Sequence, residues 1–255
     1  MSHLPDSRAS LSGRVVLITG ASSGLGAHFA GFLDSCGARV AVAARRIDSL
    51  VNQTRVTQDR ALALRMDVTD PDSVAEGVAA VVERFGRLDG LVNNAGTAWE
   101  GRAIEMGDAD WDRVIATNLT GAFTVAREAA RAMAAGQGGA IVNIASILGV
   151  RNGSGTAAYA VSKAGVVHLT HSLACEWARL GIRVNALAPG YFPTEMTQEV
   201  LEGPGAETLK KGIPMRRFGR LEDLEGPLQL LLSDAGAYIT GAVLPVDGGH
   251  LCRPL

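Results

Sequence analysis

The chain has 255 residues, of which 47% are hydrophobic and 20% are charged, and its formal net charge is −2. This composition is typical of a globular protein and excludes a disordered chain. The near-neutral charge argues against a nucleic-acid-binding protein, and no apolar run reaches the ~18 residues that a membrane-spanning helix needs.

Length and cysteine content narrow the class of protein. A chain of this length can form one large α/β domain with a substantial core. The three cysteines, Cys36, Cys175 and Cys252, are far apart and lack metal-site spacing, so we expect reduced thiols and no bound metal. The polar N-terminal segment has no apolar stretch typical of a signal peptide, which favours a cytoplasmic protein.

The first predicted strand, residues 14–19, is a run of apolar and β-branched residues, and residues 1–11 before it are expected to form a loose arm. A glycine-rich loop and a helix over residues 27–36 follow at once. This order favours a dinucleotide site over a purely structural turn, because glycines let the backbone approach a pyrophosphate and helix N-termini offer unpaired N–H groups. The expected loop contacts are Gly20, Ser22, Ser23, Gly24, Leu25 and Gly26.

The second predicted strand, residues 38–44, indicates which nucleotide binds. An acidic residue at the end of this strand would bind the ribose 2′-hydroxyl of NAD. This chain has Ala44 there, followed by Arg45 and Arg46. A guanidinium pairs well with a 2′-phosphate, so we expect NADP(H) to be favoured over NAD(H). The alternative is that both arginines are solvated loop charges.

Strands and helices continue to alternate along the chain. Further strands are predicted over residues 61–66, 88–92, 140–145, 182–187 and 242–246, and further helices over residues 71–84, 108–116, 118–135, 157–180, 194–211 and 221–232. This alternation predicts an α/β fold with a doubly wound parallel sheet of about seven strands and helices on both faces. Ligands bind beyond the carboxyl ends of such strands. Those ends are predicted at Gly20, Ala44, Asp67, Asn93, Ser146 and Pro189.

A possible catalytic group lies between the fifth strand and the next helix. Tyr159 and Lys163 are four residues apart, so both lie on one face of that helix, and Ser146 ends the strand before it. A nearby cation lowers the pKa of a phenol from its usual value of about 10, which would allow proton transfer near neutral pH. Only three of the 24 Lys and Arg residues are lysines, which favours a specific role for Lys163. The alternative is that Tyr159 and Lys163 merely share a helix.

From residue 13 to residue 249 the chain resembles the short-chain dehydrogenase/reductase family. The motifs that carry the resemblance are Thr19-Gly20-x-x-x-Gly24-x-Gly26, Asn93-Asn94-Ala95-Gly96, Asn118, Ser146, Tyr159-x-x-x-Lys163, Pro189-Gly190 with Thr194, and the closing Asp247-Gly248-Gly249. The resemblance implies a single Rossmann-type domain over residues 1–255, with residues 194–211 as a substrate lid. It also implies NAD(P)-dependent interconversion of a carbonyl and a secondary alcohol.

The resemblance further implies a role for each motif residue. Tyr159 would be the general acid/base, Lys163 would hold the nicotinamide ribose and lower the pKa of Tyr159, and Ser146 would bind the substrate oxygen. Asn118 would support a water-linked proton relay through Lys163. Further cofactor contacts would come from Asp67 and Val68 at the adenine, Asn94, Ala95 and Gly96 at the adenosine ribose, Thr194 at the carboxamide, and Pro189, Gly190 and Phe192.

The substrate is expected to be a small keto compound, reduced with NADPH. Predicted substrate contacts are Ser146, Leu148, Tyr159 and Tyr191, and other candidates for an apolar lining, each of which could equally be core, are Trp99, Ile147, Phe192 and Met196. The loop over residues 136–140 lacks basic side chains, which argues against an acyl-carrier-protein substrate. Family members of this type form homotetramers, and the apolar residues of the 157–180 helix fit an interface or a monomer core equally well.

Other functions stay open at this point. The first alternative is an NAD-dependent alcohol or sugar-acid dehydrogenase. A second is a non-catalytic NADP(H)-sensing protein, although such a protein usually lacks the Tyr or the Lys. A third is epimerisation or dehydration through the same Tyr, against which the absence of a larger C-terminal substrate domain argues.

Overall fold

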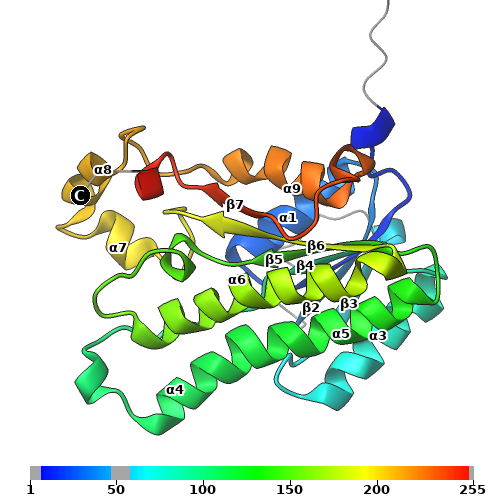
Figure 1. Cartoon of the computed structure of the whole chain (residues 1–255), viewed down its shortest axis with the longest axis horizontal. Helices are drawn as coiled ribbons and strands as arrows, with labels where there is room; N and C mark the ends of the chain where they lie inside the picture. The colour runs from blue at the N-terminus through cyan, green and yellow to red at the C-terminus, as the bar shows by residue number, and fades with distance from the viewer. Residues whose placement is uncertain (1–6, 47–57, 253–255) are drawn as a thin grey trace, which may run out of the picture.

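The computed structural model describes residues 7–46 and 58–252. Seven strands form one parallel sheet in the order β3-β2-β1-β4-β5-β6-β7 (Figure 1). The strands are β1 (Val15–Thr19), β2 (Arg39–Ala44), β3 (Ala61–Arg65), β4 (Gly90–Asn93), β5 (Gly139–Ile144), β6 (Ile182–Pro189) and β7 (Val243–Val246). The doubly wound parallel α/β fold predicted from the sequence is therefore confirmed.

Helices cover both faces of the sheet (Figure 1). In this view α1 (Gly24–Ser35) and α9 (Glu225–Leu232) lie above it, and α3 (Pro71–Phe85), α5 (Gly121–Ala134) and α6 (Ala157–Trp177) lie below it. Alternate residues of the fully buried strand β1 face the two layers, as the two-residue period of a strand requires. Val16 and Ile18 pack in the cluster that contains Phe29 of α1, whereas Val15 and Leu17 pack in the cluster that contains Val125 of α5 and Leu173 of α6.

Local sequence signals set the ends of α3. The Asp70 carboxylate accepts hydrogen bonds from the backbone N–H groups of Asp72 at 3.0 Å and of Ser73 at 3.4 Å. Pro71 occupies the first turn, where its missing N–H has no helical partner to lose. The helix ends at Gly86, which adopts a φ of 78°, a conformation that favours glycine. Asp70 is therefore the N-cap residue of α3.

Three predicted helices have a more complex form. The two helices expected over residues 108–116 and 118–135 are α4 (Asp108–Ile115) and α5, joined without a break by a π-helical turn at Ala116–Thr120. The expected 194–211 helix is divided into α7 (Gln198–Glu202) and α8 (Ala206–Gly212). Two glycines, Gly203 and Gly205, lie between α7 and α8 and account for the break.

The described part of the predicted N-terminal arm is packed against the fold. Residues Ser7–Ala9 form a 3₁₀ turn, and Leu11 is fully buried. The Gln229 side chain of α9 donates a hydrogen bond to the Ala9 carbonyl at 2.9 Å. The expectation of a loose arm is therefore wrong for residues 7–11, because a buried leucine anchors them; residues 1–6 lie outside the described residues.

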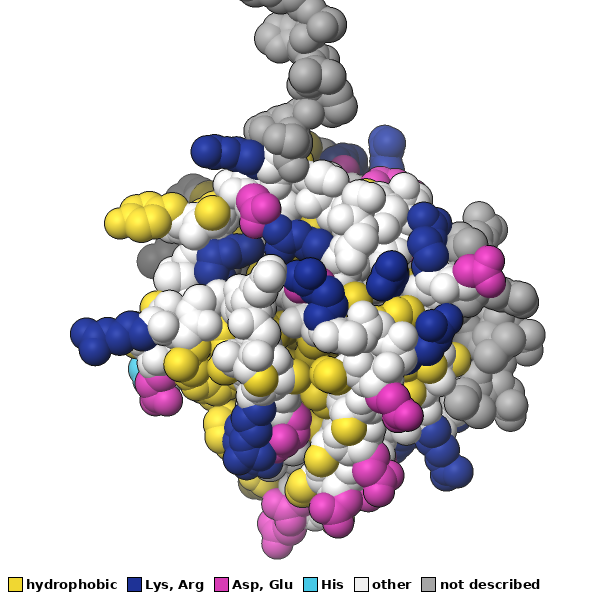
Figure 2. All heavy atoms as spheres, turned by 90° about the vertical axis from the view of Figure 1, so that its right-hand side faces the viewer, with side chains coloured by type: hydrophobic (Ala, Val, Ile, Leu, Met, Phe, Trp, Pro, Cys, Tyr) yellow, Lys and Arg dark blue, Asp and Glu magenta, His cyan; other side chains and the backbone are white. Residues whose placement is uncertain are grey.

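The amino ends of the strands carry a group of arginines (Figure 2). Arg14 forms an ion pair with Asp234, and Arg87 forms one with the buried Asp89. Arg183 donates to two backbone carbonyls at 3.0 and 3.3 Å. These side chains line a cavity of ≈ 490 Å³. The crossover helices end at this side, so these cations also lie near the negative ends of helix dipoles.

None of the helices in the described part of the chain is both long enough and apolar enough to cross a membrane.

Candidate active site

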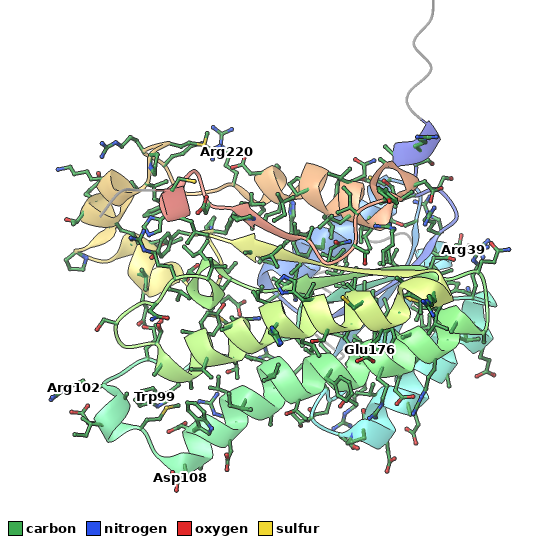
Figure 3. The ribbon with its side chains drawn as sticks, viewed as in Figure 1. Arg39, Trp99, Arg102, Asp108, Glu176 and Arg220 are labelled. Atoms are coloured by element: carbon green, nitrogen blue, oxygen red, sulfur yellow. The ribbon has the colours of Figure 1, made fainter. Side chains whose placement is uncertain are left out.

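The carboxyl ends of the strands bring the predicted motifs to one side of the molecule. The glycine loop follows β1, Asn94 follows β4, Ser146 lies just beyond β5, and Pro189 ends β6. In Figure 3 Trp99 and the start of α4 at Asp108 lie at this side, whereas Arg39 at the start of β2 lies at the opposite side. Segments far apart in the sequence therefore meet at the point between β1 and β4 where the strand order reverses, which is the usual ligand position in this architecture.

The Thr19 hydroxyl joins the ends of β1 and β4. It accepts hydrogen bonds from the backbone N–H groups of Asn94 at 3.0 Å and of Ala95 at 3.1 Å. The Asn94 side chain donates in return to the carbonyls of Thr19 at 2.9 Å and Gly20 at 3.1 Å. A Cβ on Gly26 would lie 2.4 Å from the Gly20 carbonyl oxygen and 2.6 Å from the Asn94 amide nitrogen. Close packing therefore requires a glycine at position 26.

The N-terminus of α1 opens beside this loop. Ser23 is its N-cap residue, but its side chain makes no capping hydrogen bond, so the first N–H groups of the helix have no side-chain partner there. Gly24 has a φ of 54°, and a Cβ placed on it would lie 3.4 Å from the Thr194 side chain. The glycine loop and the segment after β6 therefore lie against each other.

Asp67, which follows β3, lies near Arg45, which follows β2. Burial acts to raise the pKa of Asp67, but the Thr69 N–H and hydroxyl and the nearby Arg45 guanidinium outweigh it and hold the pKa below its usual value. Thr69 donates from its backbone at 2.9 Å and from its hydroxyl at 2.7 Å. Arg45 itself is exposed. An exposed guanidinium at this corner is positioned to meet an anionic group from solvent.

Tyr159 and Lys163 share one face of α6, as predicted. The ammonium nitrogen of Lys163 lies 5.7 Å from the centroid of the Tyr159 ring and donates to the Ile144 carbonyl of β5 at 2.7 Å. Lys163 is only 5% exposed, and burial lowers its pKa from 10.5 to about 8. Burial raises the pKa of Tyr159, and the hydrogen bond between the Tyr159 and Ser146 side chains opposes this rise without cancelling it.

The direction of the Tyr159 shift differs from the expectation of a lowered phenol pKa. Desolvation of the phenolate outweighs the hydrogen bond with Ser146, and the ammonium of Lys163 is held by a backbone carbonyl. The Ser146 hydroxyl also accepts from the Leu148 N–H at 3.1 Å, which fixes the position of its oxygen. The phenol is therefore protonated at neutral pH in this geometry.

Asn118 lies in the π-helical turn and is almost fully buried. Its side-chain oxygen accepts from the Thr97 N–H at 2.8 Å, and its amide nitrogen donates to the Thr97 carbonyl at 2.8 Å and the Ser162 hydroxyl at 2.9 Å. Both amide hydrogens are used in these two bonds. A Cβ on Gly96 would lie 3.5 Å from the Asn118 oxygen and 3.6 Å from the Lys163 nitrogen. Gly96 therefore opens a space beside both residues.

The expected substrate residues separate into two groups. Leu148 is partly exposed and follows Ser146 directly, while Tyr191 lines a cavity of ≈ 230 Å³ under residues 213–219. Phe192 is only 3% exposed, because its ring is packed beneath Gly219. Met196 is half-exposed. Phe192 also lines the ≈ 230 Å³ cavity, although its ring is part of the buried hydrophobic core.

Sequence reasoning missed several residues that organise the site. Thr97 and Ser162 hold the Asn118 amide, and Thr197 makes a set of hydrogen bonds around Thr194. Thr197 follows Thr194 by three residues, a spacing that permits a side chain to bond its own turn, but nothing in the sequence separates it from other surface threonines. The partners of Asn118 come from other elements and carry no sequence signal.

Comparisons with known proteins agree with this geometry. Residues 20–250 match a family model described as "Enoyl-(Acyl carrier protein) reductase". The chain is 39% identical over 242 residues to a 3-oxoacyl-[acyl-carrier-protein] reductase of Thermotoga maritima, which covers 94% of this chain and 98% of that protein. It is 40% identical over 253 residues to a gluconate 5-dehydrogenase of Gluconobacter oxydans, which covers 98% of both.

Solved structures show the same likeness. A gluconate 5-dehydrogenase from Burkholderia cenocepacia, in complex with NADP and tartrate, is 33% identical and superposes with a TM-score of 0.93 over 97% of this chain and 98% of that one. The protein called levodione reductase is 34% identical, with a TM-score of 0.91 over 96% of this chain and all of that one.

Proposed function

We propose that this chain, which belongs to the short-chain dehydrogenase/reductase family of NAD(P)-dependent oxidoreductases, reduces a small ketone to a secondary alcohol with NADPH. Interconversion of a carbonyl and an alcohol is the chemistry of the family; the direction, the nucleotide and the residue roles are the proposal. The observation that carries it is the meeting of Ser146, Tyr159 and Lys163 at the end of β5, where the Tyr159 and Ser146 side chains are hydrogen-bonded to each other.

The residues at this end fit a dinucleotide. Three glycines in the loop after β1 let its backbone approach a pyrophosphate, the start of α1 offers N–H groups, and Gly96 leaves space beside Asn118 and Lys163. Gly20, Ser22, Ser23, Gly24, Leu25 and Gly26 would hold the phosphates, and Asn94 to Gly96, Pro189, Gly190 and Thr194 the nucleoside ends. When bound, the nicotinamide supplies the hydride, which no protein side chain can provide.

Tyr159 acts as the proton donor in the reductive direction. Ser146 and Tyr159 present two neighbouring hydroxyl groups, and a ketone oxygen placed between them accepts a hydrogen bond from each. As hydride reaches the carbonyl carbon, negative charge grows on that oxygen and the Tyr159 proton moves to it. The raised pKa of Tyr159 keeps the phenol protonated before this step. Oxidation of an alcohol would need the phenolate, and burial of Tyr159 acts against that form.

Lys163 and Asn118 restore the proton on Tyr159. With a pKa of about 8, Lys163 is mostly charged at pH 7, in a ratio of about ten to one. One of its three hydrogens is used by the Ile144 carbonyl, so two remain for the nicotinamide ribose and a water. The Asn118 side chain has no donor left. Asn118 would therefore contribute to the proton relay through its backbone carbonyl, which would accept a hydrogen bond from the relay water. A π-helical turn disturbs the regular hydrogen bonding of a helix and can leave such a carbonyl available.

Arg45 favours NADPH over NADH. Its guanidinium is exposed beside Asp67 at the end of β2, where a 2′-phosphate on the adenosine ribose would lie. The acid that would bind the ribose hydroxyls of NAD stands at the end of β2, where this chain has Ala44, whereas Asp67 follows β3 and its Oδ1 accepts from Thr69. The NADP in the related Burkholderia structure supports the same choice.

The proposed substrate is a small keto compound that is not attached to a carrier protein. Residues 136–140, which lead from the turn after α5 into β5, contain no Lys or Arg with which to bind an acidic carrier. The gluconate dehydrogenases among the relatives make sugar-acid oxidation with NAD the second candidate. Residues 194–211, which hold α7 and α8 beside Tyr191, are proposed to act as the substrate lid.

We also propose that the protein is a homotetramer. Several apolar side chains on α4, α5, α6 and the turn after α6 are exposed: Trp111, Phe123, Val161 and Leu180. Such residues on neighbouring helices fit a surface that a second copy covers. Light scattering after size-exclusion chromatography measures the mass directly, and a monomer at micromolar concentration would contradict the proposal.

Titration of the protein with NADPH and NADH, followed by fluorescence or calorimetry, tests the nucleotide choice. We expect tight binding of NADPH and weaker binding of NADH. A panel of small ketones is then offered with NADPH, and in parallel sugar acids with NAD. Turnover of sugar acids with NAD, together with a preference for NADH, would replace the proposed function by the second candidate.

A further inference from the structure

Thr197 occupies the N-cap position of α7 but does not cap it. A threonine at this position ordinarily accepts a hydrogen bond from an N–H in the first turn of its own helix. Here the side chain makes no such bond. Its hydroxyl turns back toward the segment that follows β6. The short helix α7 therefore lacks the stabilising contact of an N-cap side chain. This indicates that the Thr197 hydroxyl stabilises the segment after β6 and not the helix.

The Thr197 hydroxyl has four polar neighbours in that segment. It lies 2.5 Å from the Phe192 carbonyl and 3.3 Å from the Thr194 carbonyl, to either of which it can donate. The Thr194 N–H donates to it at 3.0 Å, and the Thr194 hydroxyl oxygen also lies 3.0 Å away. The backbone of the same turn is closed by a bond from the Thr197 N–H to the Thr194 carbonyl at 3.0 Å.

Counting donors and acceptors fixes the direction of each bond. A hydroxyl has one hydrogen and two lone pairs. The single hydrogen of Thr197 goes to the Phe192 carbonyl, which is 0.8 Å closer than the alternative. Both lone pairs then accept, one from the Thr194 N–H and one from the Thr194 hydroxyl. The hydrogen of the Thr194 hydroxyl is thus already used, and only lone pairs remain on its outer side.

We infer that Thr197 is a positioning residue, which holds the Thr194 hydroxyl as a hydrogen-bond acceptor toward the cofactor. An acceptor selects the NH₂ end of a nicotinamide carboxamide and does not bond its carbonyl end. This inference rests on the proposed function, in which Thr194 meets the carboxamide. It adds the polarity of that contact and the residue that sets it.

The position of Thr194 supports this reading. A Cβ placed on Gly24 of the glycine loop would lie 3.4 Å from the Thr194 side chain, so Thr194 lies at the proposed cofactor site. Thr194 and Thr197 are both partly exposed, which leaves room for a ligand atom beside them. Orienting the carboxamide also orients the nicotinamide ring, and hence the face from which hydride leaves.

Binding of two nucleotides tests the inference without any turnover. The probes are NADP⁺ and its 3-acetylpyridine analogue, in which a methyl group replaces the carboxamide NH₂ and the carbonyl is kept. In the natural protein the analogue leaves the Thr194 acceptor without a donor, and we expect NADP⁺ to bind about tenfold more tightly. In Thr197→Val the Thr194 hydroxyl regains a free hydrogen that can bond the carbonyl of either probe, and we expect the ratio to fall to about twofold.

Control measurements separate positioning from general damage. Thr197→Ser keeps the hydroxyl and should restore the tenfold ratio. Binding of 2′,5′-ADP, which lacks the nicotinamide end, should be unchanged in both variants. If Thr197→Val does not fold, Thr197→Ala takes its place. The affinity ratio of NADP⁺ to the 3-acetylpyridine analogue in the natural protein is measured without any variant.

Two results would overturn the inference. One is equal affinity of the natural protein for NADP⁺ and the analogue. The other is an unchanged tenfold ratio in Thr197→Val with both probes weakened equally, which is the behaviour of a residue that only supports the turn. Failure to bind any nicotinamide nucleotide would instead contradict the proposed function, so the two failures are distinguishable.

Discussion

The two ends of the sheet hold their cations in different ways. At the amino ends of the strands the cations are partly exposed: Arg87 pairs with Asp89, Arg14 pairs with Asp234, and Arg183 donates to two backbone carbonyls. At the carboxyl ends Lys163 is almost fully buried, and among the described residues no carboxylate lies within ion-pair distance of it. The depth of burial separates the two ends, because an almost fully buried cation without a carboxylate is typical of a functional site.

The largest expected effect is that of Tyr159→Phe at the carboxyl ends. Removal of one hydroxyl should lower turnover by about a thousandfold or more, because the proton donor is lost, and leave NADPH affinity nearly unchanged. Steady-state rates and a nucleotide titration on the same sample measure both. Turnover within a few fold of the natural protein would break the assignment of chemistry to this end.

At the amino ends, Asp89→Ala should lower stability and leave the chemistry intact. The carboxylate accepts from the Val15 N–H at 2.9 Å and from the Arg87 side chain, and its loss leaves a buried donor and an unpaired cation. We expect a loss of about 2–4 kcal/mol in the free energy of unfolding. Urea unfolding measures it, with Asp89→Asn as the milder control. A matching fall in kcat/KM of the folded protein would show that the two ends are not separate in function.

Lys163→Met should have the reverse profile: less activity and more stability. A pKa lowered from 10.5 to about 8 corresponds to about 3 kcal/mol of unfavourable burial of the charged form, part of which is offset by the lost bond to the Ile144 carbonyl. We therefore expect a net gain of about 1–3 kcal/mol in the free energy of unfolding near pH 7.

The pH dependence of this gain has a definite sign. Between pH 8 and pH 10.5 the unfolded chain holds a proton on Lys163 that the folded protein has released, so the natural protein regains stability as pH rises through this window. The advantage of Lys163→Met is therefore largest below pH 8 and shrinks above it. Urea unfolding of both proteins at pH 7 and pH 9.5 is the measurement; an advantage that grows with pH would contradict the lowered pKa.

Arg45→Ala should give the smallest effect, because this cation is exposed. We expect the KM for NADPH to rise about tenfold, the equivalent of one charge-assisted hydrogen bond, and the KM for NADH to change little. Arg46→Ala is the matched control from the next position, which is also exposed. Equal loss with both nucleotides would mean that Arg45 does not contact a 2′-phosphate.

The sequence was informative wherever one residue type is needed for a local reason. The glycines of the loop after β1, the cap at Asp70 and the alternation of strands and helices all follow from such reasons, and the structure has them. The π-helical turn was not foreseen, because the 108–135 pattern is compatible with two helices or with one. The break between α7 and α8 was also missed, although two glycines mark it.

Interactions between distant segments could not be read from the sequence. That Lys163 would donate to the Ile144 carbonyl depends on how closely α6 packs on β5, and the same packing raises the pKa of Tyr159. Phe192 belongs to a motif beside the proposed site, yet its ring is core, because Gly219 lies against it. Burial and its electrostatic effects are properties of the assembled fold, whereas residue spacing is local.

The hydrogen bond between the Thr19 hydroxyl and the Asn94 N–H also has a consequence for folding during synthesis. The two residues are 75 positions apart, so a ribosome that has just made the glycine loop has not yet made the strand that holds it in place. At about 5–20 residues per second, several seconds pass before β4 can enter the sheet beside β1. During that interval the nascent loop has the sequence of a nucleotide site without its shape, and a nucleotide would gain little by binding to it.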